Sequence, residues 1–265
     1  MRIYFMLSYD VVFKPNLLYQ LLLRCPGKAV GVAEVRKISN SVKPKQKGKR
    51  SNKIGFSTFW GFKGIFWLGG TIFLRKLSSA MPVPHYLRSR STIKRVSKLF
   101  GVPYDLVDDV NDAPYLEHLS LIKPDIIVSF QHQIFGEKLL SLPNIACINC
   151  HPAKLPEYRG VKPIFWAMLN GDEEIGVTVH TMEPKIDTGR IIIQKCFRVL
   201  KDSTLMDNYV MAYSTSADII TEALRMIGRN RDLNTLTTIP PTSKYYNNPN
   251  RTDLKCFKKA GLKII

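Results

Sequence analysis

The stretch INCHPAKLPEYRG, residues 148–160, decides how this chain is expected to fold. It continues the apolar run Ile145–Ile148, which predicts a short buried strand. Side chains two residues apart in a strand point to the same side, so Asn149 and His151 should emerge together at its carboxyl end. Open α/β sheets bind their ligands at that end. The stretch therefore predicts an amide and an imidazole that share one site.

A second strand is expected downstream, over Gly176–Met182, and it is followed by the tripeptide Asp187-Thr188-Gly189. A carboxylate that lies near an imidazole orients the ring and favours its charged form. Asp187 is therefore a candidate partner for His151.

These segments together resemble the formyltransferases that use 10-formyltetrahydrofolate. The family includes glycinamide ribonucleotide transformylases, methionyl-tRNA formyltransferases and sugar-nucleotide N-formyltransferases. The resemblance rests on the pattern Asn-x-His-Pro-x-x-Leu-Pro-x-Tyr-Arg-Gly, then Gly-Val-Thr-Val-His, then Asp-Thr-Gly. It is strongest over Lys123–Leu200, weaker over Met1–Glu34 and absent from the basic segment that follows Glu34.

The resemblance implies roles for particular residues. It implies that Asn149, His151 and Asp187 are the catalytic trio. It also implies that the segment after the strand at 125–129 lines the pterin-binding cleft, largely through backbone groups; the residues are Phe130, Gln131, His132, Gln133 and Ile134. The expected co-substrate is 10-formyltetrahydrofolate, and no metal is expected.

The expected fold is α/β, with a Rossmann-like, mostly parallel sheet flanked by helices. The chain starts with a strand at Met1–Leu7, a helix at Asn16–Leu23 and a strand at Lys28–Val35, as in a parallel βαβ unit. Further strands are expected at 104–107, 125–129 and 191–199, and helices at 86–101, 113–121 and 205–228 and within 160–171. A catalytic domain is expected over 1–228, with an insert at 36–80 and a C-terminal extension at 229–265, for which no helix or strand is expected.

The formal net charge of +18 favours an anionic partner, such as nucleic acid, an acidic membrane surface or a phosphorylated substrate. The five cysteines are scattered and odd in number, which favours reduced thiols and a cytoplasmic protein. Asp10 interrupts the apolar start, so no secretory signal is expected. Cys147-Ile148-Asn149-Cys150-His151 matches a haem-attachment pattern, but buried thiols in an apolar strand are the better interpretation.

The insert has two parts. Arg36–Lys53 is cationic, lacks acidic residues and predicts a disordered loop. The segment at 55–76 is aromatic, glycine-containing and flanked by basic residues. It is interpreted either as a folded insert or as a peripheral contact with the inner membrane surface, with a true membrane span as a weaker interpretation.

The leading function is formyl transfer to a primary amine of an anionic small-molecule acceptor, an amino sugar on a nucleotide or lipid phosphate. Phosphoribosylglycinamide ranks second, because Ser8–Val12 lacks the glycines of a phosphate-binding loop. Methionyl-tRNA ranks third, because the chain after Asn230 is too short for the tRNA-binding barrel of that family. Two further functions are compatible with the sequence: hydrolysis of formyltetrahydrofolate, and a non-catalytic RNA- or membrane-binding role on the same scaffold.

Overall fold

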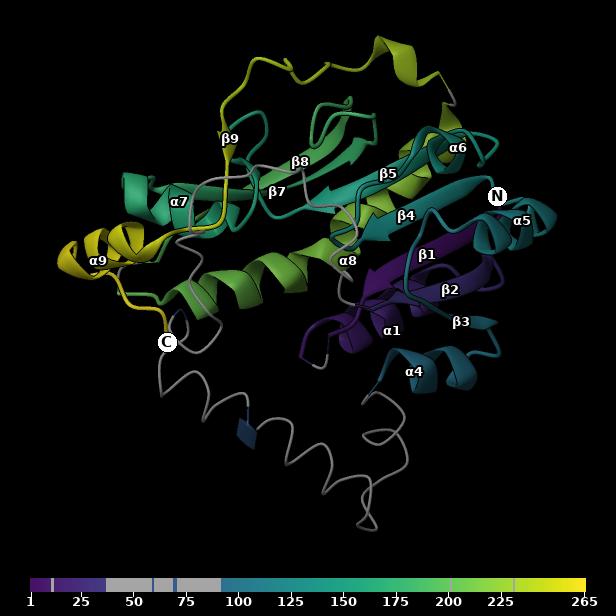
Figure 1. Ribbon diagram of the computed structural model, residues 1–265, viewed down its shortest axis with the longest axis horizontal. Helices are drawn as coiled ribbons and strands as arrows, with labels where there is room; N and C mark the ends of the chain where they lie inside the picture. The colour runs from purple at the N-terminus through teal and green to yellow at the C-terminus, as the bar shows by residue number, and fades with distance from the viewer. Residues whose placement is uncertain (11, 37–58, 60–68, 71–91, 201, 231) are drawn as a thin grey trace, which may run out of the picture.

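The computed structural model describes residues 1–10, 12–36, 59, 69–70, 92–200, 202–230 and 232–265. The described chain is built on a seven-stranded sheet with the order β3-β2-β1-β4-β5-β7-β8 (Figure 1). The first five strands along the chain pair in parallel, and β7 and β8 are antiparallel. The strands are β1 (Ile3–Ser8), β2 (Ala29–Val35), β3 (Tyr104–Val107), β4 (Ile126–Phe130), β5 (Ala146–His151), β7 (Glu174–Thr181) and β8 (Ile191–Arg198).

Helices cover both faces of the sheet. The side chains of β1 alternate: Ile3, Phe5 and Leu7 enter one core, while Tyr4 and Met6 enter the other. The first core is closed by α1 (Lys14–Arg24), α4 (Ile93–Leu99), α7 (Pro163–Asn170) and α8 (Leu205–Arg229). The second core is closed by α5 (Ala113–Ile122) and α6 (Glu137–Leu140). Every residue of β4 is buried, as expected for a central strand covered on both sides.

The predicted fold class is confirmed, since this is a mostly parallel α/β sheet between two layers of helices. The helix expected at 86–101 is described only as Ile93–Leu99, which Thr92 caps. Of the insert at 36–80, the structure describes only 36, 59 and 69–70. The predicted membrane contact at 55–76 therefore lies almost wholly outside the described residues. None of the helices in the described ranges is long and apolar enough to cross a membrane.

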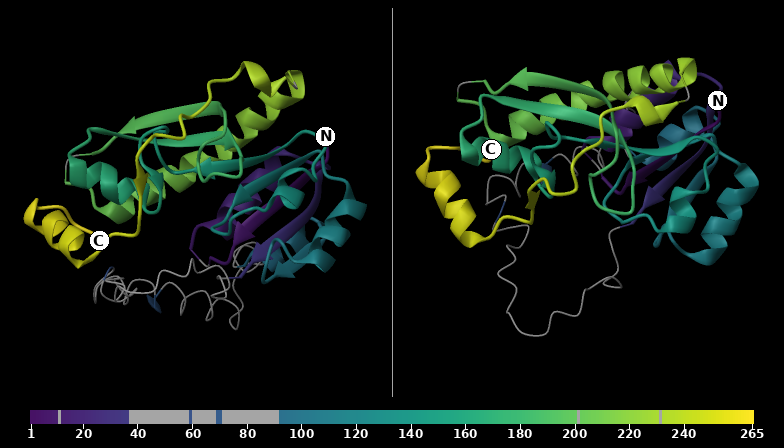
Figure 2. Two further views of the ribbon diagram at one scale, coloured as in Figure 1. Left: turned by 45° about the horizontal axis from the view of Figure 1, so that its top comes forward. Right: turned by 90° about the horizontal axis from the view of Figure 1, so that it is seen from above.

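The C-terminal segment contains elements that the sequence interpretation missed. A 3₁₀ turn (Leu233–Thr235) precedes the short strand β9 (Tyr245–Tyr246), which pairs in parallel with β6 (Arg159–Gly160). Helix α9 (Arg251–Lys259) follows, and its amino end carries a capping box between Asn250 and Asp253. It lies at the opposite end of the molecule from α5 (Figures 1 and 2). The expectation that this segment contains no regular element was wrong.

The capping box was the available signal for α9. Asn250 accepts a hydrogen bond from the backbone N–H of Asp253, whose carboxylate accepts one from the N–H of Asn250. Leu254 and Phe257 then recur at helical spacing and are buried. Phe257 stacks on Phe165 of α7, with ring centroids 4.6 Å apart. Helix α9 therefore packs on α7 and the core that it helps to close, although the status of 229–265 as a separate unit stays a prediction.

Phe257→Ala should destabilise the whole protein. The side chain is fully buried, and truncating such a phenylalanine costs about 3 to 5 kcal/mol of unfolding free energy. Urea denaturation followed by circular dichroism measures this loss. Lys255→Ala on the exposed face of α9 is the control and should change stability by less than about 0.5 kcal/mol. An equally small loss for Phe257→Ala would mean that α9 is not docked in solution.

Candidate active site

The last residues of β5 carry the predicted amide and imidazole. Asn149 is half-buried, while His151 is only 7% exposed. Both lie at the carboxyl end of a strand that pairs in parallel with β4 on one side and antiparallel with β7 on the other. The predicted position of both residues is therefore the one observed, at the edge of the sheet where α/β proteins bind ligands.

Asp187 reaches the same place from the loop after β7. Its backbone is left-handed, with φ of 52°, and its carboxylate Oδ2 accepts a hydrogen bond of 2.8 Å from the N–H of Gly160. Gly189 lets the loop press against β7, because a Cβ there would lie 1.7 Å from the carbonyl oxygen of Thr181. The Asp-Thr-Gly motif thus has a physical basis: its glycine permits the close approach that delivers the aspartate.

The structure brings the predicted trio together. The Nε2 atom of His151 lies 3.8 Å from Oδ2 of Asp187, within ion-pair range but beyond a hydrogen bond. The same Nε2 is 3.2 Å from the carbonyl oxygen of Tyr158, to which it can only donate. A protonated Nε2 thus faces both a carbonyl and a carboxylate, which suits a ring that gains positive charge.

A fourth residue, His180 of β7, joins the site and was not assigned from the sequence. It stands opposite Asn149 in the β5–β7 register. Its Nδ1 is 2.7 Å from the carbonyl oxygen of Thr181, so Nδ1 carries the hydrogen and Nε2 is an acceptor. The amide nitrogen of Asn149 lies 3.4 Å from that acceptor, and Oδ1 of Asp187 lies 3.7 Å from it. His180 therefore orients the amide so that its nitrogen, the donor end, faces the site.

Burial keeps His180 neutral. The ring is 2% exposed, and loss of water lowers its pKa to about 4, while the nearby charge of Asp187 acts in the opposite direction. A neutral ring at pH 7 is what the acceptor role toward Asn149 requires.

This low pKa predicts a pH dependence of stability. Between pH 6.5 and pH 4 the unfolded chain binds a proton at His180 that the folded chain does not bind. The free energy of unfolding should therefore fall on acidification across that window, by on the order of 3 kcal/mol from this residue. Urea denaturation of the wild type and His180→Gln at several pH values measures the effect. In His180→Gln the free energy of unfolding should fall less steeply on acidification than in the wild type. In His118→Gln, which replaces a half-exposed histidine, it should fall as steeply as in the wild type.

The side chains of two of the five residues expected to bind the co-substrate already hydrogen-bond within the protein. Gln131 donates to the carbonyl oxygen of Gln133 at 2.7 Å, and Gln133 donates to that of Asp108 at 2.7 Å. His132 and Ile134, in contrast, are exposed beyond the end of β4. Phe130, the last residue of β4, is 6% exposed and therefore packs in the core. The two exposed side chains are the ones available to a ligand.

Cationic side chains surround this end of the sheet. The side chain of His132 is exposed at its surface, but protein surrounds much of the ring. This partial burial lowers the pKa of His132 to about 4, and the charges of Lys14 and Lys162 act in the same direction. Burial also lowers the pKa of both lysines to about 8. Lys162 comes two residues after Gly160, in a left-handed conformation directly before α7. Two lysine charges therefore lie close to His132 at this end of the sheet.

Arg159 ties the site to the C-terminal segment. Its guanidinium is buried at 5% exposure and donates twice to the carbonyl oxygen of Ile186, at 2.7 and 3.2 Å. It also donates to the carbonyl oxygens of Pro241 and Ser243, at 3.1 and 2.9 Å. Ile186 directly precedes Asp187, so this one side chain links the aspartate loop to the segment before β9.

The cysteines of the haem-like pattern are buried on opposite faces of β5. Cys147 enters the core under α5 and α6, while Cys150 enters the core under α8. Burial raises the pKa of both thiols. They therefore behave as small apolar side chains, as expected. Within the described ranges, no three His, Cys, Asp or Glu side chains gather in a way that could hold a metal ion.

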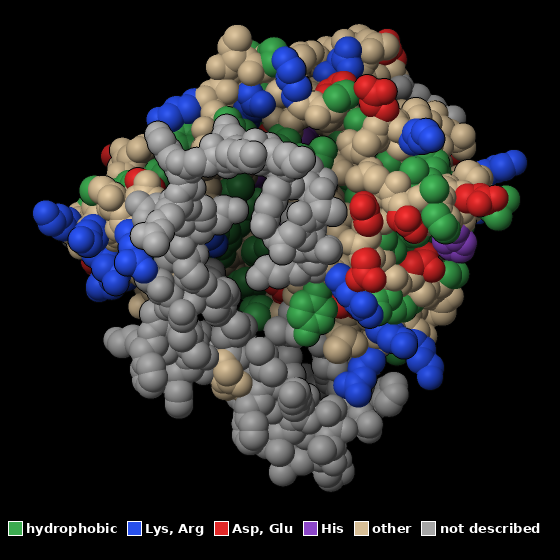
Figure 3. Space-filling view, in the orientation of Figure 1, with side chains coloured by type: hydrophobic (Ala, Val, Ile, Leu, Met, Phe, Trp, Pro, Cys, Tyr) green, Lys and Arg blue, Asp and Glu red, His purple; other side chains and the backbone are tan. Residues whose placement is uncertain are grey.

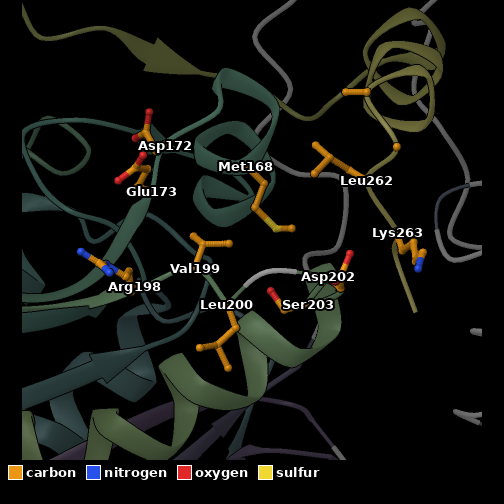
Figure 4. A pocket seen from close by; sticks show the side chains of 12 residues that line it. Met168, Asp172, Glu173, Arg198, Val199, Leu200, Asp202, Ser203, Leu262 and Lys263 are labelled. Atoms are coloured by element: carbon orange, nitrogen blue, oxygen red, sulfur yellow. The ribbon is translucent and has the colours of Figure 1, made fainter.

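Two other surface features lie away from the trio. A cavity of about 620 Å³ opens between α7, the end of β8 and the C-terminal tail (Figure 4); its lining includes Met168, Arg198 and Lys263, but none of the trio. Lysine and arginine side chains also gather over α9 (Figure 3), where Arg251, Lys255, Lys258 and Lys259 are exposed. Both features are therefore separate from the candidate site.

Comparisons with known proteins find formyltransferases. Residues 104–224 match the family model described as formyl transferase. The methionyl-tRNA formyltransferase of Chlorobium chlorochromatii (strain CaD3) is 34% identical over 143 residues, which cover 54% of this chain and 46% of the relative. The resemblance to formyltransferases is confirmed over the matched part of the chain. The chain spans less than half the length of the first curated relatives it matches.

Solved structures share the fold at low identity. Phosphoribosylglycinamide formyltransferase from Streptococcus pneumoniae TIGR4 has a TM-score of 0.57 and 17% identity, over 86% of this chain and 98% of that one. An N-formyltransferase from Helicobacter canadensis, in complex with folinic acid and dTDP-3-aminofucose, has a TM-score of 0.55 and 19% identity. That match covers 96% of this chain and 72% of the other.

Proposed function

We propose that this protein transfers a formyl group from 10-formyltetrahydrofolate to a primary amine. The observation that carries the proposal is the convergence of Asn149, His151 and Asp187 at the carboxyl end of β5, with His180 orienting the amide. An amide donor, an imidazole and a carboxylate are the groups that acyl transfer to an amine requires. The match of residues 104–224 to the formyl transferase family supports the same reaction.

Asn149 stabilises the negative charge that develops during the reaction. One hydrogen of its side-chain amide faces Nε2 of His180, which leaves the second hydrogen for a ligand. As the amine attacks, negative charge develops on the formyl oxygen, and Asn149 donates a hydrogen bond to it. Because His180 fixes the amide before substrate arrives, the donor needs no reorganisation during the reaction.

His151 and Asp187 handle charge and protons. The carboxylate of Asp187 is held by the N–H of Gly160 and lies within 4 Å of both imidazoles. It stabilises a positively charged His151, and it accepts, directly or through a water, the proton that the amine loses. His151 in turn places positive charge beside the developing oxyanion.

The residues after β4 fit the co-substrate. His132 and Ile134 are exposed, and the loop that presents them is braced by the side chains of Gln131 and Gln133. A planar pterin needs such a preformed edge with backbone groups and apolar surface. The co-substrate, when bound, supplies the formyl group.

An anionic acceptor suits the charge of the site. Lys14 and Lys162 lie near His132 at the same end of the sheet, and the chain carries a net charge of +18. We infer that the acceptor is an amino sugar carried on a nucleotide or lipid phosphate. The structural relative from H. canadensis, which was solved with an amino sugar nucleotide, supports this choice. Phosphoribosylglycinamide and methionyl-tRNA are the competing acceptors.

The test is incubation of the purified chain with 10-formyltetrahydrofolate and a panel of amines, with product detected by mass. The panel contains dTDP- and UDP-linked amino sugars, phosphoribosylglycinamide and methionyl-tRNA. Formylated amino sugar is the expected product, and Asn149→Ala is the inactive control. Release of formate without any formylated amine would instead identify a hydrolase. The proposal fails if the protein neither binds the folate nor turns it over.

A further inference from the structure

One buried hydroxyl group beside the candidate site makes no hydrogen bond. Ser129 is the fourth residue of β4 and is only 1% exposed. Its Oγ atom is closed off from solvent, and it has no hydrogen-bond partner among the described residues. A buried polar group without a partner costs free energy, so buried hydroxyls nearly always have one. The exception at Ser129 therefore calls for a functional explanation.

The register of the sheet places this hydroxyl beside Asn149. Ser129 and Asn149 are paired in the parallel ladder between β4 and β5. Ile127 and Cys147, two residues earlier in each strand, both enter the core under α5 and α6. Since side chains two residues apart point to the same side of a strand, Ser129 and Asn149 share that face of the sheet. Adjacent strands lie about 4.8 Å apart, so the two side chains are direct neighbours.

The other neighbours of Ser129 on this face are poor partners for a hydroxyl. Met6 of β1 is paired with it on the opposite side, and a thioether is only a weak acceptor. Gln131 follows two residues later, but its amide is already used at both ends: it donates to the carbonyl oxygen of Gln133 and accepts from the N–H of the same residue. The amide of Asn149 is therefore the neighbouring polar group that the hydroxyl can use.

The oxygen of that amide lies on the correct side. The nitrogen Nδ2 of Asn149 is 3.4 Å from Nε2 of His180, which belongs to β7. Oδ1 is bonded to the same carbon as Nδ2 and points away from it, so it turns away from β7. Because β5 lies between β7 and β4, this is the side on which Ser129 stands. A change of the serine rotamer about its Cα–Cβ bond redirects the hydroxyl toward Oδ1.

We propose that Ser129 is a positioning residue, whose hydroxyl turns to donate a hydrogen bond to Oδ1 of Asn149 as charge develops on the formyl oxygen. A hydrogen bond accepted by an amide oxygen polarises the amide and strengthens its N–H groups as donors. The hydroxyl is unpaired before the reaction and paired in the transition state, so the bond lowers the barrier. This inference rests on the proposed function, because it assigns a role within the same reaction.

The first test is kinetic. With the amine that the panel identifies, Ser129→Ala should lower kcat by about 3- to 10-fold, as expected for the loss of one hydrogen bond between neutral groups. KM for 10-formyltetrahydrofolate should not change, because Oγ is buried away from any surface that a ligand contacts. The same substitution made in Asn149→Ala should lower kcat no further. A variant that merely misplaced β4 would raise KM and would lose activity in both backgrounds.

Three further variants separate the hydroxyl from its size and burial. Ser129→Thr keeps the hydroxyl and should keep kcat near that of the wild type, whereas Ser129→Cys has only a weak donor and should behave like Ser129→Ala. Ser97→Ala is the matched control, because Ser97 is also fully buried but donates to the carbonyl oxygen of Ile93 within α4. Its replacement should leave kcat unchanged. Wild-type kcat in Ser129→Ala, or an equal further loss in Asn149→Ala, would overturn the proposal.

The melting temperature tests the free hydroxyl without any formyl transfer. Removing a buried hydroxyl that has no partner relieves the cost of its burial, so Ser129→Ala should melt about 2 to 4 °C above the wild type. An unchanged or lower melting temperature would mean that Ser129 already has a partner before the reaction, and it would overturn the proposal. Absence of formyl transfer by the wild type would instead count against the proposed function, and it would leave the melting result unaffected.

Discussion

Asn149→Ala should lower kcat for formyl transfer by about 100- to 1000-fold, the loss seen when one oxyanion donor is removed from other acyl-transfer sites. The reason is geometric. The amide of Asn149 is held by Nε2 of His180 at 3.4 Å, at the end of a strand in the middle of the sheet. Alanine cannot donate a hydrogen bond, and no other side chain occupies its place in the strand. The charge that develops on the formyl oxygen would go unstabilised.

Steady-state kinetics with formylated product as the readout measures this loss. The melting temperature should stay close to that of the wild type, because Asn149 is only half-buried and its backbone bonds in β5 are kept. Asn144→Ala is a matched control, since Asn144 bonds Asp125 on an exposed surface and should leave kcat unchanged. Wild-type-like turnover in Asn149→Ala would refute its role.

A double-variant cycle separates Asn149 from His180. If His180 acts by orienting the amide, His180→Gln alone should lower kcat. The same substitution made in Asn149→Ala should lower kcat little further. Fully additive effects would instead mean that His180 acts on the reaction independently of Asn149.

The position of the site could be predicted from the sequence because it depends on local rules. Side chains alternate along a strand, which predicts that Asn149 and His151 point to the same side. Both follow an apolar strand, and the carboxyl ends of parallel strands are where α/β sheets bind ligands. The structure has both features, and it supplies the distance of 3.8 Å between His151 and Asp187 that no pattern gives.

His180 was missed because its role depends on strand register. It was visible within Gly-Val-Thr-Val-His, but only the antiparallel pairing of β7 with β5 sets it opposite Asn149. Period-two alternation states which face a residue occupies and not which residue on the neighbouring strand it meets. Gln133 is a similar case, since its hydrogen bonds to Asp108 and Val110 join residues more than twenty positions apart.

The C-terminal elements were missed for two different reasons. β9 has only two residues, and its partner Arg159–Gly160 lies more than eighty positions earlier, so neither strand has a pattern of its own. Gly160 accepts that close pairing because a Cβ there would lie 2.3 Å from the carbonyl oxygen of Tyr246. Helix α9, in contrast, begins at a capping box of Asn250 and Asp253, a pattern that is visible in the sequence. It was missed because the segment was interpreted from its high charge alone.

Asp187→Asn should lower kcat by about 100- to 10,000-fold, the range that a positioned acid–base group contributes. Asparagine tolerates the left-handed backbone at this position, and its amide oxygen can still accept the hydrogen bond from Gly160. The loop should therefore survive, and the loss would come from the missing charge. Without it, a protonated His151 is no longer stabilised and the amine proton has no carboxylate to reach.

The same reasoning predicts that the loss in Asp187→Asn is one of kcat and not of binding. Folate binding, measured by calorimetry, should change little, because Asp187 faces the two imidazoles. Asp202→Asn is the matched control: Asp202 also has a left-handed backbone but lines the separate cavity, so its replacement should leave kcat unchanged. If Asp187→Asn kept wild-type turnover, Asp187 would be a structural residue of the loop, and proton removal would have to be assigned to His151.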